Sequence, residues 1–159
     1  MIPELAVSAH TFAMDEPFLE ALVNDFTDAD WAVKDPVGHD ARWLVGHLAV
    51  TRRRLMAMVG LVPPVEDWEA AFGRGSSPAQ VPGNIDPRML VQAFRSAQQA
   101  LAGHWETLTG ADLARPLGRT LPDGSDTLGG AVRFLAWHEA YHLGQVGFMR
   151  RLAGRAGRA

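Results

Sequence analysis

The feature that most constrains the fold of this chain is the recurrence of apolar residues at helical spacing in four separate segments. These segments are 17–27, 41–59, 87–108 and 128–152. In each, apolar side chains recur three or four residues apart and would line one face of a helix. No pair of segments shows the alternation of two paired strands. Because such stripes are buried by packing against one another, we predict an all-α fold, a four-helix bundle.

The predicted helix ends carry residues that cap helices. Pro17 follows two acidic residues and suits a first turn, so the first helix is expected to begin there, after a loose start. Side chains that can accept bonds from the free N–H groups precede the other helices, namely Asp40, Asp86 and either Asp126 or Thr127. Glycines that suit a helix stop, Gly60 and Gly154, follow the second and fourth helices.

The segments between these helices are predicted to be loops. Residues 28–38 and 109–126 contain Pro, Gly and Asp, and the second includes the turn sequence 122–125. Residues 61–85 are rich in Pro, Gly and Ser, with one helical turn expected at 66–72. A loop of this length in a compact domain often acts as a lid or binding loop. The 159 residues are long enough for one domain, which we expect to span 1–159.

Composition excludes several classes of function. With 47% hydrophobic and 21% charged residues and no apolar run of membrane-spanning length, the chain reads as soluble, and without a signal sequence it is expected in the cytoplasm. The net charge of -3 gives no reason to expect a nucleic-acid or membrane partner. The chain has no cysteine, which excludes disulfides, thiolate ligands and a cysteine nucleophile. Any thiol chemistry would need an external thiol.

Two histidines in the last predicted helix lie on the same helix face. His138 and His142 are four residues apart, so both imidazoles project from one face and can grip one metal ion. Read literally, 138–142 is the H-E-x-x-H of zinc metalloproteases. Those proteases usually take a third ligand from downstream, and residues 143–159 contain no His, Asp, Glu or Cys. The third ligand must therefore come from upstream.

His47 is the upstream candidate. It lies in the middle of the apolar face of the second predicted helix, about two turns in, and can meet His138 and His142 inside a bundle. Three neutral imidazoles with an open position suit zinc, nickel, iron or cobalt and do not suit calcium or magnesium. The residues alone nevertheless favour a hydrogen-bonded core histidine at this position. On the same helix, 52–54 is a run of arginines expected to face solvent or a partner.

Two further residues are candidates for catalysis. Gln145 comes three residues after His142 on the same face, where it could hydrogen-bond a ligand, water or substrate. Glu139 is rotated about 100° from His138, so a contact between helices or between subunits is preferred to a general base, and both readings stay open. His104 is expected at the surface or behind the ligands.

The residues W-L-V-G-H-L-A at 43–49 and A-W-H-E-A-Y-H-L-G-Q at 136–145 resemble the DinB/YfiT-like superfamily of metal-dependent enzymes, and the similarity covers nearly the whole chain. The resemblance implies a bundle of up-down-down-up order with a long crossover between helices two and three. It implies a divalent transition metal held by His47, His138 and His142, with zinc or nickel ahead of iron or cobalt. It also implies a homodimer.

The activities in that superfamily differ. Some members transfer or isomerise with low-molecular-weight thiols such as bacillithiol or mycothiol, and others are hydrolases. The resemblance therefore implies a metal-dependent transferase or hydrolase that activates water or an external thiol toward a small-molecule substrate. The alternative is a non-catalytic metal- or ligand-binding helical module, such as a stress-related sensor or a structural dimer. An interaction protein without any metal is a third hypothesis. An open coordination position would favour the enzyme.

Overall fold

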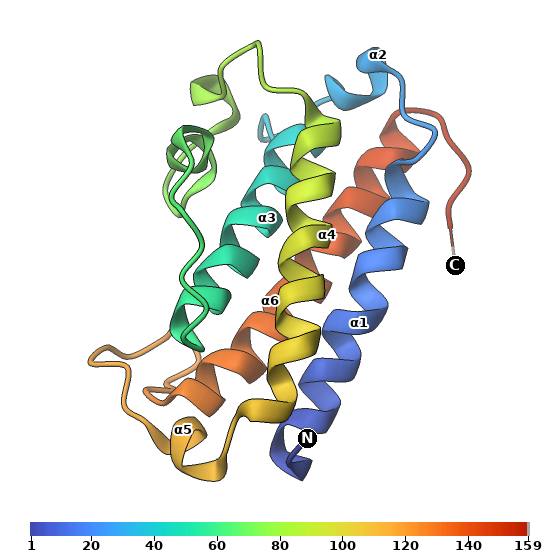
Figure 1. Cartoon of the computed structure of the whole chain (residues 1–159). Helices are drawn as coiled ribbons and strands as arrows, with labels where there is room; N and C mark the ends of the chain where they lie inside the picture. The colour runs from blue at the N-terminus through green and yellow to red at the C-terminus, as the bar shows by residue number, and fades with distance from the viewer. Residues whose placement is uncertain (159) are drawn as a thin grey trace.

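A computed structural model describes residues 1–158, and it is a four-helix bundle (Figure 1). The long helices are α1 (Pro3–Val23), α3 (Ala41–Met58), α4 (Pro87–His104) and α6 (Leu128–Leu152). The connections contain the short helices α2 (Asp28–Trp31) and α5 (Gly110–Ala114) and the 3-10 turns η1 (Asp67–Phe72), η2 (Pro78–Gln80) and η3 (Trp105–Thr107). Within residues 1–158 there are isolated β-bridges but no strand. The predicted all-α bundle is confirmed.

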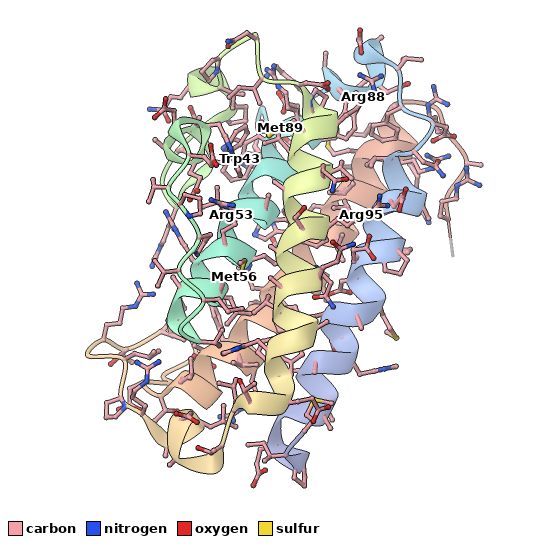
Figure 2. All side chains as sticks on the ribbon, in the orientation of Figure 1. Trp43, Arg53, Met56, Arg88, Met89 and Arg95 are labelled. Carbon is pink, nitrogen blue, oxygen red and sulfur yellow. The ribbon has the colours of Figure 1, made fainter. Side chains whose placement is uncertain are left out.

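The direction of the helices determines which side chains can meet. In Figure 1, α1 and α6 run one way, and α3 and α4 run the other. Residues 59–86 form the crossover segment, which returns along the outside of the bundle from the end of α3 to the start of α4. Figure 2 shows Trp43 and Arg53 pointing from α3 toward this crossover segment. α3 packs against α6 in antiparallel fashion, and His47 and Arg52 of α3 contact residues 138 and 139 near the middle of α6.

The first helix begins much earlier than Pro17, and that prediction is wrong. α1 starts at Pro3, and Pro17 lies inside it. A proline inside a helix costs roughly 3 kcal/mol because it lacks an N–H and crowds the carbonyl four residues back. Residues on both sides of Pro17 are fully buried, including Leu5, Phe12 and Leu19. Burying each such side chain contributes about 1.5–3 kcal/mol, so the continuous stripe outweighs the proline.

Most of the other predicted boundaries hold. The Asp40 side chain accepts a bond from the Trp43 N–H at 2.8 Å, and Gly60 has φ of 96° just beyond α3. Thr127 caps α6, and Gly154 follows it with φ of 75°. α4 ends at His104, and its last predicted turn is 3-10. α2 and α5 fall in segments predicted as loops, although each begins with a Thr-x-x-Asp capping box that the sequence displays.

The bundle core contains a buried ion pair, which corrects the expectation that Arg52 faces solvent. Arg52 is 1% exposed, and its Nε donates to Glu139 Oε2 at 2.8 Å. A second nitrogen, Nη2, donates to Glu139 Oε1 at 2.5 Å and to the Phe12 carbonyl at 2.8 Å. The guanidinium carbon lies 3.8 Å from the centre of the Phe94 ring. This one side chain therefore joins α3 to α1, α4 and α6.

A second carboxyl group lies in the same part of the core. Asp15 is buried, and burial raises its pKa. Burial also raises the pKa of Glu139 to about 8, although Arg52 opposes the shift. The charge of Arg52 lowers the pKa of both carboxyl groups and so opposes the effect of burial.

No helix in the part of the chain that the structure describes combines the length and the apolar character needed to cross a membrane.

Candidate metal centre

The structure brings together His47 from α3 and His138 and His142 from α6. The Nε2 atom of His138 lies 3.4 Å from that of His47 and 3.1 Å from that of His142. The candidate ligand atoms of all three lie within 4.8 Å of one another. Two nitrogen ligands about 2.0–2.1 Å from a tetrahedral ion are about 3.3 Å apart, so the observed spacings fit a shared transition-metal ion.

His47 is held so that one ring nitrogen is free. Its Nδ1 lies 2.9 Å from the Phe72 carbonyl at the end of η1, so Nδ1 carries the hydrogen and donates it. The ring stacks on Trp43, with centroids 5.1 Å apart and planes 9° from parallel. The Trp43 Nε1 donates to Ser76 Oγ at 3.1 Å, which links this stack to the crossover segment. Nε2 is therefore left unprotonated and faces the other two histidines, as a ligand requires.

Gly46 explains how η1 comes close enough to orient His47. A Cβ at this position would lie 2.3 Å from the Phe72 ring, a distance that real side chains do not adopt. Phe72 is fully buried against α3 at this point. Gly46 and His47 therefore act together. The lack of a side chain at Gly46 leaves room for the Phe72 ring, and the Phe72 carbonyl orients His47.

The α6 ligands are oriented differently from one another. The Nδ1 of His142 lies 2.5 Å from Gln145 Oε1, so the amide oxygen accepts the ring hydrogen and leaves Nε2 free. Gln145 Nε2 in turn donates to the Tyr141 hydroxyl at 3.4 Å. Within residues 1–158, the buried Nδ1 of His138 has no hydrogen-bond partner. Gln145 thus lies beside His142 and fixes the orientation of its ring, and its candidate role in catalysis stays a prediction.

The electrostatic setting keeps the three imidazoles neutral. Burial lowers the pKa of His138 and of His142 to about 4, and neighbouring histidines add to both shifts. Burial also lowers the pKa of His47, with a smaller contribution from the positive charge of Arg54. At pH 7 all three side chains are therefore in the neutral form that a metal ion would bind.

Three other predicted residues lie apart from this centre. Glu139 points into the core and binds Arg52, so its candidate role as a general base stays a prediction. The Nε2 of His104 donates to the Val59 carbonyl at 2.8 Å, at the end of α3. His39 stacks on the far side of Trp43, with centroids 5.2 Å apart, and is not one of the three clustered histidines.

A cleft of about 260 Å³ opens beside His47 and His138. Its apolar wall includes Met58, Leu121 and Phe134. Its charged lining consists of three arginines, Arg54, Arg74 and Arg119. Sequence reasoning missed these arginines as site residues. One signal was available for Arg54, which follows His47 by seven residues and so lies on the same helix face. The other two come from loops, where spacing gives no such signal.

Fold and site together define the class: a four-helix bundle with a three-histidine centre at the edge of a cleft. The model of the DinB superfamily matches residues 17–146, and the chain belongs to this superfamily. Among solved structures, the chain is similar to YfiT from Bacillus subtilis, described as a probable metal-dependent hydrolase with an unusual four-helix bundle topology. The TM-score is 0.72 at 18% identity, over 98% of this chain and 91% of that one. No curated protein matches the sequence significantly.

Proposed function

We propose that the protein is a metal-dependent enzyme whose divalent transition metal is held by His47, His138 and His142. The observation that carries this proposal is the convergence of the three imidazoles, with Nε2 atoms of His47 and His142 that lie 3.4 and 3.1 Å from that of His138, the spacing of ligands to one ion. Buried neutral imidazoles suit zinc and nickel first, and iron or cobalt next. The hydrolase description of YfiT supports the same class of chemistry.

The proposed reaction is hydrolysis, or group transfer to an external low-molecular-weight thiol. A bound ion of this kind supplies a water or thiol with a lowered pKa at neutral pH. The chain's own part is to bind and orient. The Phe72 carbonyl and Gln145 hold the ligand rings, and the cleft beside His47 and His138 receives a small-molecule substrate. The absence of cysteine supports water or an external thiol over a covalent cysteine intermediate.

The alternative is a non-catalytic module with a structural metal or a sensing pocket. A structural zinc site is usually closed by four protein ligands. Among the described residues, no fourth His, Cys, Asp or Glu joins the three histidines. An incomplete set of protein ligands beside a cleft favours the enzyme.

The test combines metal analysis with a spectroscopic probe. Protein purified without an affinity tag should contain about one transition metal per chain, and His47→Ala, His138→Ala and His142→Ala should each lose most of it, whereas His104→Ala should not. Cobalt-loaded protein should change its visible absorption when 2-mercaptoethanol or azide is added. A cobalt spectrum indifferent to both would favour the closed, non-catalytic site. If the intact protein contains no metal, both the metal-dependent enzyme and the structural metal site are rejected.

We also propose that the protein forms a homodimer. Trp137, Tyr141 and Phe148 lie on one side of α6, are 61%, 53% and 50% exposed, and offer an apolar surface to a second copy. Sedimentation equilibrium of the intact chain tests this, and a mass of one chain at micromolar concentration would reject it.

A further inference from the structure

The charge of the cleft beside the metal centre is unbalanced. Arg54 comes from α3, Arg74 follows η1, and Arg119 comes from the loop before α6. The lining of the cleft contains no Asp or Glu. Across residues 1–158, no carboxylate pairs with any of these three side chains. Three like charges from three separate segments therefore meet at one small cleft.

Several arginines elsewhere in the chain pair with a carboxylate of the protein. Arg52 pairs with Glu139, Arg53 with Glu69 and Arg95 with Glu16. A run of three adjacent arginines on α3 thus contains two that are neutralised by the protein and one, Arg54, that faces the cleft. Solvent can stabilise exposed guanidinium groups, but it does not explain why unpaired groups gather at a single concave site.

The position of Arg54 relates the charge to the metal centre. It lies on the α3 face that also carries His47, Thr51 and Met58, all of which line the cleft. Its Nη2 lies 3.0 Å from the position that a Cβ on Gly73 would occupy, so the guanidinium rests against the crossover segment beside Arg74. Met58, Leu121 and Phe134 contribute apolar surface to the same cleft. The lining of the cleft therefore combines cationic groups, apolar surface and two candidate metal ligands.

We infer that the substrate is a small organic anion, a carboxylate with an apolar body, whose carboxylate is bound by Arg54, Arg74 and Arg119 while its reacting end faces the three histidines. The orientation of the reacting end toward the histidines rests on the proposed function. The binding of the carboxylate group rests on the three arginines alone. Guanidinium groups bind carboxylates through paired, charge-assisted hydrogen bonds, which a neutral substrate of the same shape would not form. A cleft of about 260 Å³ lies at the small end of ligand pockets and limits the body to the size of one ring with a short chain.

The test is an NMR titration of the intact protein with benzoate and with benzamide, its neutral counterpart. Both the zinc-loaded and the chelator-treated protein are titrated. Benzoate should bind on the order of tenfold more tightly than benzamide in both forms, because the arginines do not need the metal. The single variant Arg54→Gln should lose this preference. The triple variant Arg54→Gln, Arg74→Gln, Arg119→Gln should lose it as well. Arg151→Gln removes the same charge from the exposed last turn of α6 and should leave both affinities within about twofold.

The outcomes separate this inference from the proposed function. Equal binding of the two probes, or an equal loss in Arg151→Gln, overturns the arginine site even if zinc is bound normally. Benzoate binding that disappears when zinc is removed also overturns it, since the carboxylate would then be a metal ligand. Arginine-dependent benzoate binding in a protein that holds no metal would support the anion site and reject the metal-dependent enzyme.

Discussion

At the scale of single residues, the rings of His47, His138 and His142 converge, whereas His104 Nε2 donates to the Val59 carbonyl and His39 stacks on Trp43. The spacing of His138 and His142 predicted their shared face, and the residues around His47 resembled a superfamily motif. The acceptor for His47, the carbonyl of Phe72, could not be predicted, because it lies 25 residues away in an irregular segment. Gln145 was predictable since it lies on the same helix as the ligand it orients.

We predict that Gln145→Leu weakens metal binding without unfolding the protein. The Nδ1 of His142 would lose the oxygen that fixes the orientation of its ring. Loss of such a partner typically lowers metal affinity roughly 10- to 100-fold. Competition with a chromophoric chelator measures this change. Gln92→Leu, an exposed amide on α4 that contacts Ser96, is the matched control and should bind metal normally. Equal affinities in the two variants would show that Gln145 does not orient His142.

A second residue-scale prediction concerns acid stability of the metal-free protein. Burial lowers the pKa of His138 and His142 from 6.5 to about 4. Between these values the unfolded chain binds more protons than the folded one, so the free energy of unfolding should fall as the pH falls from about 6.5 to about 4. Urea unfolding at several pH values measures the slope. The double variant His138→Ala, His142→Ala should have a shallower slope, and an unchanged slope would contradict the assigned shifts.

At the scale of the elements, helical periodicity predicted which segments are helices better than it predicted which way their charged residues point. Residues 52–54 were expected to face outward together, but successive residues on a helix are about 100° apart. Arg52 faces the core, Arg53 faces Glu69 in the crossover segment, and Arg54 faces the cleft. Glu139 was expected to make a contact between helices or subunits, but its partner could not be predicted, because Arg52 lies on another helix 87 residues away.

The buried pair leads to a prediction on stability. Glu139→Leu should lower the free energy of unfolding by about 3–5 kcal/mol, because the buried Arg52 guanidinium would lose both of its hydrogen bonds to the Glu139 carboxylate. The double variant Arg52→Leu, Glu139→Leu should be more stable than the single one. Glu69→Gln, which breaks the partly exposed pair with Arg53, should cost less than about 1 kcal/mol. Denaturant unfolding measures all three. The metal content of Glu139→Leu should equal that of the unsubstituted protein. Loss of metal in this variant would show that Glu139 contributes to the three-histidine centre.

Gly46 supports a prediction about the contact between α3 and η1. In Gly46→Ala the new methyl would collide with the Phe72 ring and push η1 away, which should cost about 1–3 kcal/mol. The Phe72 carbonyl would then leave His47 Nδ1, so metal affinity should fall as well. Gly103→Ala is the control. It lies in α4 with nothing within 4 Å of a Cβ, and should stabilise the helix slightly. Unchanged metal affinity in Gly46→Ala would show that η1 does not orient His47.

At the scale of the whole molecule, the bundle followed from the apolar stripes, but the length of its first helix did not. Local rules place a helix start at Pro17, and the packing of Leu5 and Phe12 against the rest of the core overrides them. Two buried clusters extend from end to end of the bundle, and their apolar residues come from all four long helices. His47 is buried and stacks on Trp43 of one cluster, whereas His138 and His142 are half-buried, so the centre lies at the edge of the apolar core.

This arrangement leads to the last prediction, that metal removal leaves the bundle folded. Because the apolar core is complete without the three histidines, the metal-free protein should keep its helical circular dichroism and a cooperative thermal transition. Added metal should raise Tm with concentration, since it binds only the folded chain. The triple variant His47→Ala, His138→Ala, His142→Ala should keep the same helical content and lose the response of Tm to metal. If chelation instead abolished the cooperative transition, the metal would be required for folding. That result would contradict the proposal of a catalytic metal site.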